Sequence, residues 1–261
     1  MKYRLVALDL DGTLLDEHKI VPFETIQLLQ KLARQGITIV LASGRPEAGV
    51  KKIIEELGIE SEIPLILFNG AEVKMRGITK DYSLSEQECN EVIKAARKRK
   101  SELAIWQKDK FFLEKQTLFS QEYLQINGVK PAYVKAEEVV QGGASKILFL
   151  GNKANLKKWQ DELITEIGEK INVHRSGEKL LEFVSKAASK GAALEWICSQ
   201  TGVRQCETIA IGDGENDLSM IRYAGLSVAM GNACEEVLHA ADVITLRNDQ
   251  NGVKAILEKY F

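Results

Sequence analysis

Acidic residues and glycines follow two apolar runs that lie far apart in the chain. Residues 9–13 read Asp-Leu-Asp-Gly-Thr and residues 212–217 read Gly-Asp-Gly-Glu-Asn-Asp, so that Asp9, Asp11, Asp213 and Asp217 come directly after or close to an apolar segment. Four carboxylates in one cleft repel one another unless a cation neutralises them. Oxygen ligands without His or Cys favour Mg²⁺, which commonly binds one or two carboxylates together with a substrate phosphate oxygen. We therefore expect a magnesium site that takes a phosphorylated compound.

Two other uses of such a motif are excluded by the spacing. A calcium-binding EF-hand loop that began at Asp9 would need Gly and Glu where the chain has Leu14 and Ile20, and one that began at Asp213 would have Leu218 at its glycine position. A dinucleotide-binding turn fails because Asp217 stands where its third glycine belongs. A simple Asp-Gly turn explains either motif taken alone, but not both together.

Two further polar sets lie at the predicted ends of other elements. Residues 43–45 read Ser-Gly-Arg after an apolar run, and Lys190-Gly191 opens a predicted helix over 192–200. The chain has 3 His and 4 Cys, and none of them forms the paired spacing of a catalytic zinc site or a disulfide framework. Any chemistry is therefore expected from the carboxylates.

The elements that position these residues alternate between strand and helix. The N-terminal part predicts strands over 4–8, 37–42 and 63–68, with helices over 22–36 and 47–57, and the last strand stops at Asn69-Gly70, a hairpin signal. The C-terminal part predicts strands over 208–211, 226–230 and 243–245 and a helix over 217–223. Such alternation is typical of a parallel α/β sheet, in which ligands bind beyond the carboxyl ends of the strands.

The middle of the chain has a different pattern. It predicts helices over 85–98, 117–125 and 154–167 and strands over 103–106, 111–113, 146–150, 172–174 and 180–184. We expect an α/β, Rossmann-like core domain formed by residues 1–82 and 186–261, and an inserted α+β domain formed by residues 83–185, about 100 residues long.

The composition is that of an average globular protein. The 261 residues are 45% hydrophobic, and 35 Lys and Arg against 37 Asp and Glu leave a net charge of −2, so no charge excess predicts nucleic acid or an anionic membrane as a partner. The basic run over 94–100 is interpreted as the end of a helix. No secretion signal or membrane span is visible, which predicts a cytoplasmic protein, and nothing predicts the oligomeric state.

Taken together, the motifs resemble those of the haloacid dehalogenase superfamily of phosphohydrolases, in particular its Cof-type branch with a large α+β cap. The resemblance covers essentially the whole chain: residues 9–13, 43–45, 190–191 and 212–217 appear in that order, and residues 228–233 and 251–253 also look like that branch. The insert lies where this branch carries its cap.

The resemblance implies a role for each matching residue. Asp9 would be the nucleophile that forms an aspartyl-phosphate, and Asp11 would be the general acid and base. Mg²⁺ would be held by Asp9, the backbone carbonyl of Asp11 and Asp213, with Asp217 orienting its water shell. Ser43 and Lys190 would hold phosphoryl oxygens. Asn216 would bind substrate, and the residues left to line the pocket are Thr13, Gly44, Arg45 and Asn69.

The resulting hypothesis is a Mg²⁺-dependent phosphatase for a small phosphorylated metabolite such as a sugar phosphate. Its cap would close over the cleft and contact the leaving group. A phosphomutase with the same aspartyl chemistry, and a phosphate-compound-binding protein without catalysis, remain alternatives. The cap side chains that would select the substrate cannot be named from the sequence, because one scaffold serves many functions.

Overall fold

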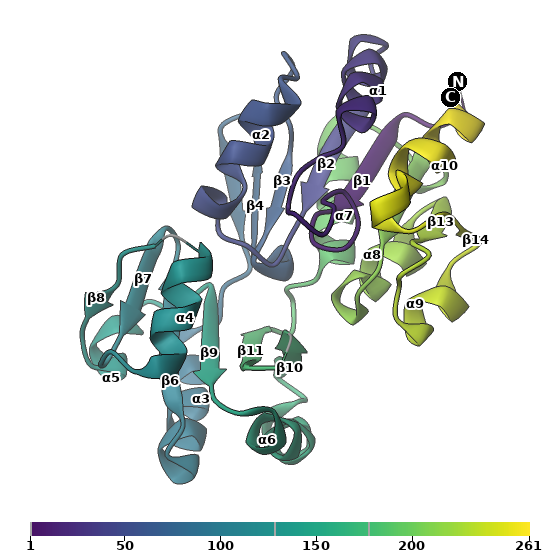
Figure 1. Ribbon diagram of the computed structural model, residues 1–261. Helices are drawn as coiled ribbons and strands as arrows, with labels where there is room; N and C mark the ends of the chain where they lie inside the picture. Colours follow the sequence, from purple (N-terminus) through teal and green to yellow (C-terminus); the bar gives the residue numbers. More distant parts are fainter. Residues whose placement is uncertain (1, 128, 177) are drawn as a thin grey trace. The chain divides into compact units, whose positions relative to one another are not determined.

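The computed structural model describes residues 2–127, 129–176 and 178–261 (Figure 1). The chain divides into two compact units. Unit 1 combines two distant segments, Met1–Lys80 and Ser189–Phe261, and unit 2 is the continuous segment Asp81–Ala188. Each unit has its own sheet.

Unit 1 is built on a mostly parallel eight-stranded sheet, which confirms the predicted α/β class. Its strand order is β14-β13-β12-β1-β2-β3-β4-β5, and every pair from β14 to β3 is parallel. In this order the strands are β14 (Val243–Ile244), β13 (Leu226–Ala229), β12 (Thr208–Gly212), β1 (Leu5–Asp9), β2 (Thr38–Ala42), β3 (Leu65–Leu67), β4 (Glu72–Met75) and β5 (Ile78–Asp81).

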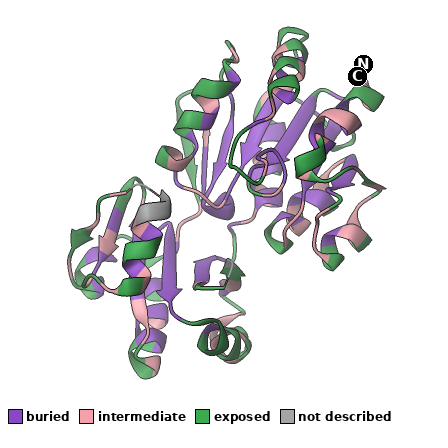
Figure 2. Ribbon diagram, viewed as in Figure 1, coloured by how far each residue is buried: buried purple, intermediate pink, exposed green. Residues whose placement is uncertain are grey.

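The central strand β1 joins the two distant segments of unit 1. Leu5 is in register with Thr38 of β2 on one side and with Thr208 of β12 on the other. All five residues of β1 and of β12 are buried. Helices cover both faces of such a sheet, and an unbroken apolar run then suits both sides. Figure 2 shows buried residues along strands of this unit. The parallel register brings the carboxyl ends of β1, β2 and β12 to one edge.

Most helices of unit 1 were predicted, with bounds that differ in detail. They are α1 (Phe23–Arg34), α2 (Lys51–Leu57), α7 (Lys190–Thr201), α8 (Leu218–Tyr223), α9 (Glu235–Ala240) and α10 (Gly252–Tyr260). The predicted helix over 47–57 is divided into a 3₁₀ turn, Glu47–Gly49, and α2. Another 3₁₀ turn, Glu215–Asp217, precedes α8. The strands β4 and β5 and the helices α9 and α10 were not predicted.

The Asn69-Gly70 signal does mark a hairpin. β3 pairs antiparallel with β4, and the connection runs through a short 3₁₀ turn, Phe68–Gly70. Three consecutive residues, Phe68, Asn69 and Gly70, have positive φ there. Such conformations cost energy at positions other than glycine and are retained where the surrounding structure over-determines them.

Unit 2 has a six-stranded sheet with the order β10-β11-β9-β6-β7-β8. Its strands are β6 (Glu102–Gln107), β7 (Lys110–Leu113), β8 (Ala132–Tyr133), β9 (Lys146–Leu150), β10 (Ile171–Ser176) and β11 (Leu180–Ser185); its helices are α3 (Glu86–Arg99), α4 (Leu118–Asn127), α5 (Ala136–Val139) and α6 (Lys153–Ile167). A single apolar cluster joins the sheet to α3, α5 and α6. The short elements β8 and α5 were not predicted.

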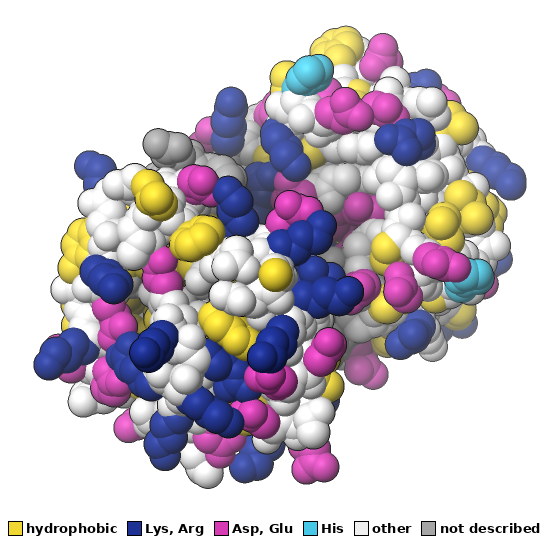
Figure 3. All heavy atoms as spheres, turned by 60° about the horizontal axis from the view of Figure 1, so that its bottom comes forward, with side chains coloured by type: hydrophobic (Ala, Val, Ile, Leu, Met, Phe, Trp, Pro, Cys, Tyr) yellow, Lys and Arg dark blue, Asp and Glu magenta, His cyan; other side chains and the backbone are white. Residues whose placement is uncertain are grey.

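The basic run over 94–100 is balanced by acidic side chains within unit 2. Arg97 pairs with Glu114 and Glu137, and Arg99 pairs with Glu162 and with Glu166. The face drawn in Figure 3 has Lys and Arg side chains mixed with Asp and Glu. Among the described residues, no helix combines the length and apolar character needed to span a bilayer.

Candidate active site

The loop after β1 is shaped by Gly12. Its φ is +90°, and a Cβ placed there would lie 2.3 Å from Oδ2 of Asp213, so any larger residue would collide with that carboxylate. The amide N–H of Leu14 donates to the carbonyl of Asp9, and the side-chain amide of Asn232 donates to the carbonyl of Gly12. The loop therefore turns sharply at the sheet edge and lets Asp213 approach.

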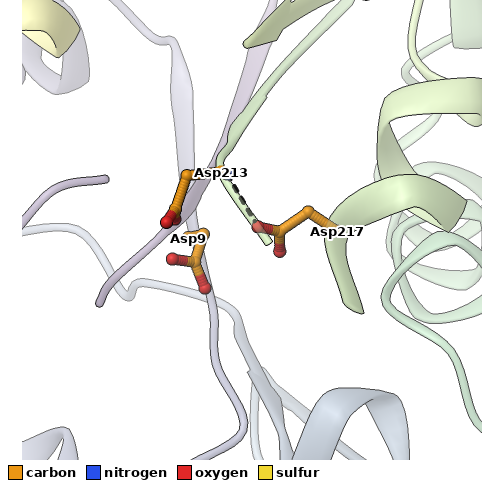
Figure 4. A group of neighbouring side chains, drawn as sticks. All are labelled: Asp9, Asp213 and Asp217. Carbon is orange, nitrogen blue, oxygen red and sulfur yellow. Dashed lines mark hydrogen bonds between the residues drawn. The ribbon is translucent and has the colours of Figure 1, made fainter. Parts of the chain in front are cut away.

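Three of the four predicted acids meet at this edge. Asp9 ends β1, Asp213 follows β12, and Asp217 ends the 3₁₀ turn before α8; each offers a carboxylate oxygen, and these atoms all lie within 4.8 Å of one another (Figure 4). Oδ2 of Asp217 accepts hydrogen bonds from the backbone N–H of Asp213 at 2.9 Å and of Gly214 at 3.0 Å. These bonds hold Asp217 toward the other two acids.

Lys190 contributes the buried cation of the cluster. It is the first residue of α7, where the Ser189 side chain caps the helix. Its Nζ donates to Oδ1 of Asp9 at 2.5 Å and to Oδ1 of Asp217 at 2.6 Å, and the side chain is fully buried. Burial lowers the pKa of Lys190, but the charges of Asp217 and Asp9 outweigh burial, so its pKa is raised and it stays charged.

Two of these carboxylates, Asp9 and Asp213, resist ionisation in this environment. Burial, and then the charge of Asp217, raise the pKa of Asp9 well above its usual range, although Lys190 opposes the shift. The same two causes raise the pKa of Asp213 to about 6, against a hydrogen bond from Thr13 that lowers it. Asp9 and Asp213 therefore ionise less readily than exposed aspartates, and a further cation beside them would favour their ionised forms.

This donor set fits a hard divalent cation. Asp9, Asp213 and Asp217 offer only oxygen ligands, which suit Mg²⁺ better than softer metals. A bound cation would relieve the repulsion that raises the pKa values of Asp9 and Asp213. The residues present therefore fit the metal that the sequence predicts.

The side chain of Asp11 is engaged elsewhere. Nε and Nη2 of Arg45 donate to its two oxygens at 2.7 and 2.5 Å, and Nζ of Lys19 donates to Oδ1 at 2.9 Å. Burial raises the pKa of Asp11, but the hydrogen bonds and charges of Arg45 and Lys19 outweigh burial and lower it. A general acid needs the opposite shift, so this arrangement presents Asp11 as a carboxylate.

The other predicted residues line the same edge. Oγ1 of Thr13 donates to Oδ1 of Asp213 at 2.9 Å, and Oγ of the buried Ser43 accepts from the N–H of Arg45 at 3.1 Å. The Asn216 side chain donates to Oδ1 of Asn69 at 3.0 Å.

Gly44 lies against the same asparagine. A Cβ at Gly44 would stand 3.1 Å from Oδ1 of Asn69. The predicted residues thus gather at one edge of unit 1, with Arg45 directed to Asp11.

Two participants were not predicted from the sequence. Lys19 contacts Asp11 from a turn for which the sequence offered no signal. Asn232 supports Gly12 and lies in the segment 228–233, which was noted only as part of the resemblance. The hydrogen-bond partner of an asparagine side chain on a loop cannot be predicted from the sequence, because it depends on which segment the fold places beside that loop.

Comparison with known proteins identifies the family. Residues 6–257 match the family described as haloacid dehalogenase-like hydrolase. The chain therefore belongs to this family and is a hydrolase.

Individual relatives and solved structures span the chain. The phosphatase YwpJ of Bacillus subtilis (strain 168) is 29% identical, over 98% of this chain and 99% of its own. From the same organism, 5-amino-6-(5-phospho-D-ribitylamino)uracil phosphatase YwtE is 28% identical, over 98% of this chain and 97% of its own. A crystal structure of a haloacid dehalogenase-like hydrolase from Bacteroides thetaiotaomicron superimposes with a TM-score of 0.89 at 33% identity and covers 100% of both chains.

Proposed function

We propose that this protein is a Mg²⁺-dependent phosphatase that hydrolyses a small phosphomonoester through an aspartyl-phosphate on Asp9. The observation that carries the proposal is the cluster of Asp9, Asp213 and Asp217 around the buried ammonium group of Lys190. Family membership and the names of the two Bacillus phosphatases support it.

Asp9 is suited to the nucleophilic role. Its carboxylate ends a rigid buried strand, and Oδ1 is held by the Lys190 ammonium group at 2.5 Å. A carboxylate attacks phosphorus without first losing a proton, and the covalent intermediate divides one difficult displacement into two easier ones. Lys190 opposes the burial that raises the pKa of Asp9, and so favours the ionised form that attacks.

The metal site would use Asp9, Asp213, Asp217 and the backbone carbonyl of Asp11. Mg²⁺ bound there supplies positive charge that stabilises the negative charge on the phosphoryl oxygens. Thr13 orients Asp213 through its hydroxyl, and the backbone N–H groups of residues 213 and 214 orient Asp217.

Phosphate oxygens would be held from the neighbouring strand ends. Ser43 offers a hydroxyl after β2, Lys190 offers a fixed charge from α7, and Asn216 offers an amide already oriented by Asn69. Positioning and charge supply most of the catalysis in phosphoryl transfer. A sugar or sugar-alcohol phosphate is the proposed substrate class, because YwtE is named for a phosphoribityl compound. Unit 2 is proposed to act as the cap that selects it.

A phosphate-release screen tests the proposal. Sugar phosphates, nucleotides, polyol phosphates and p-nitrophenyl phosphate are each incubated with the protein, with and without Mg²⁺. We expect Mg²⁺-dependent release for at least one metabolite. Absence of metal-dependent turnover on every compound contradicts the proposal.

The Asp9→Asn variant tests the covalent step. We expect its turnover to fall about a thousandfold or more, since removal of a nucleophile costs several orders of magnitude. Asp161→Asn, an exposed substitution on α6, is the matched control and keeps full activity. Acid-quenched wild type should carry radiolabelled phosphate on the peptide that contains Asp9. Activity of Asp9→Asn above a few per cent rejects the aspartyl-phosphate.

A further inference from the structure

The carboxylate of Asp11 is held by two cations that the sequence did not associate with it. Arg45 binds both oxygens with two N–H groups, Nε to Oδ2 and Nη2 to Oδ1, and Lys19 adds a third donor to Oδ1. A carboxylate has about four acceptor positions on its two oxygens. Among the described residues these are the donors to the Asp11 side chain, which leaves one acceptor position, on Oδ2.

Both cations are presented by ordered backbone. The N–H of Arg45 donates to Ser43, its carbonyl accepts from the N–H of Phe68 at 3.2 Å, and its Nη1 donates to the carbonyl of Gly49 at 3.1 Å. Both the backbone and the guanidinium group of Arg45 are therefore held in place, so its bidentate contact with Asp11 has a defined direction.

Lys19 comes from a tight turn over residues 16–20. Oδ1 of Asp16 accepts from the N–H groups of His18 and Ile20 at 2.8 and 2.9 Å, and the N–H of Asp16 donates to the carbonyl of Ile20 at 3.0 Å. Lys19 has a φ of +63°, an uncommon conformation for a residue with a side chain. In this conformation Nζ of Lys19 lies 2.9 Å from Oδ1 of Asp11.

A purely stabilising ion pair does not account for this arrangement. The side chains are 41% exposed at Asp11, 26% at Arg45 and 59% at Lys19, and ion pairs this exposed contribute about 0–1 kcal/mol. Asp11 lies two residues after Asp9, which belongs to the acid cluster. Arg45 and Lys19 fix the orientation of the Asp11 carboxylate and, among the described residues, leave one acceptor position open on Oδ2.

We infer that Arg45, with Lys19, is a positioning residue that holds Asp11 as the general base for hydrolysis of the aspartyl-phosphate. The inference rests on the proposed function and goes beyond it, because it assigns Arg45 to the second half-reaction rather than to phosphate binding. In this step the water oxygen bonds to phosphorus while Oδ2 of Asp11 takes a water proton. The bond between phosphorus and the Asp9 oxygen breaks, and its electron pair returns to the Asp9 carboxylate.

Pre-steady-state kinetics with p-nitrophenyl phosphate separate the two half-reactions. The value of kcat/KM reports phosphorylation of Asp9, which ends when nitrophenolate leaves, whereas kcat includes hydrolysis of the aspartyl-phosphate. For Arg45→Ala we expect kcat to fall about tenfold to a hundredfold, a part of the 10²–10⁴ that a general base supplies, with kcat/KM changed less than about threefold. A nitrophenol burst close to one per active site should precede slow turnover, and acid-quenched phosphoenzyme should accumulate.

Three variants complete the experiment. Arg45→Lys keeps the positive charge but loses the bidentate pair of N–H donors, so we expect its kcat to lie between those of Arg45→Ala and wild type. Lys19→Met should lower kcat by a smaller factor, again without lowering kcat/KM. Arg34→Ala, on the exposed side of α1, is the control for loss of a surface arginine and should behave as wild type. Circular dichroism establishes whether each variant is folded. If Arg45→Ala does not fold, the kinetics of Arg45→Lys provide the test.

The outcomes distinguish this inference from the proposed function. A parallel fall of kcat and kcat/KM in Arg45→Ala, without phosphoenzyme, overturns the inference and assigns Arg45 to phosphate binding or to the first step. Unchanged values of both parameters overturn it as well. Wild type that neither turns over an aryl phosphate nor becomes labelled rejects the proposed function itself.

Discussion

Replacing Lys190 by Met should destabilise unit 1 strongly in the absence of metal. Methionine keeps the length of the side chain but removes the ammonium group, which contacts Asp9 at 2.5 Å and Asp217 at 2.6 Å in a fully buried position. Removal of one partner of a buried ion pair leaves an uncompensated charge and costs about 3–5 kcal/mol. We therefore expect the free energy of unfolding of unit 1 to fall by about this amount near pH 7.5.

The loss should depend on pH and on Mg²⁺ in defined directions. Asp9 and Asp213 have pKa values raised by burial and by the charge of Asp217, and the pKa of Asp213 is about 6. Near pH 5 these groups take up protons, so the repulsion and the loss of stability become smaller. Mg²⁺ at about a hundred times its dissociation constant should restore about 2.7 kcal/mol near pH 7.5.

Hydrogen exchange in increasing urea, read by mass spectrometry, measures the two units separately. Peptides from β1 and β12 report unit 1, and peptides from β6 and β9 report unit 2 as an internal reference. Lys52→Met, an exposed substitution on α2, is the matched control. Equal stability of Lys190→Met and wild type near pH 7.5, or the same loss at both pH values, refutes the reasoning about the acid cluster.

Two further predictions concern the same cluster. Gly12→Ala should weaken Mg²⁺ binding, measured by calorimetric titration, about tenfold or more, because the new Cβ would lie 2.3 Å from the Asp213 carboxylate. Gly36→Ala is the control for backbone strain alone, since Gly36 has a similar φ of +87° but a Cβ there would have no neighbour among the described residues within 4 Å. Equal effects of the two substitutions argue against a role of the contact with Asp213. The metal-free wild type should lose up to about 3 kcal/mol of stability as pH rises from about 4 through 6, because the pKa of Asp213 is higher in the folded than in the unfolded state. Urea unfolding at several pH values should show a smaller loss for Asp213→Asn. An identical pH profile for the variant and the wild type contradicts the shifted pKa.

The buried elements of unit 1 were predictable from the sequence because burial on both faces leaves an unbroken apolar run. Strands such as β1 and β12 therefore stood out, and their carboxyl ends located Asp9 and Asp213 at one edge. β5 was missed because its four residues are all exposed and carry no such pattern. The helix α9 was missed because, of its six residues, Val237 is the one that is buried, so the sequence shows no repeating apolar face there.

The surroundings of Asp11 were not predictable for a different reason. The Asp-Leu-Asp-Gly-Thr motif identified Asp11 as a candidate, but the partners of its side chain depend on the paths of two loops in the folded protein. Lys19 reaches it from a turn with positive φ, and Arg45 reaches it across 34 positions of sequence. Contacts of this kind follow from tertiary structure. The resemblance implied a general acid and base at Asp11 but not the ion pairs with Arg45 and Lys19, which lower its pKa.

The divided chain of unit 1 has a consequence for how the protein is made on the ribosome. β1 is synthesised before unit 2, whereas one of its two partner strands, β12, begins at Thr208, after unit 2. Unit 2 is continuous, so its sheet has every strand available before that point, and domains generally fold as units while synthesis proceeds at about 5–20 residues per second. The nascent chain therefore carries Asp9 without Lys190 or Asp213 while the whole of unit 2 is synthesised, and the acid cluster is assembled only after β12 and the residues that follow it have emerged.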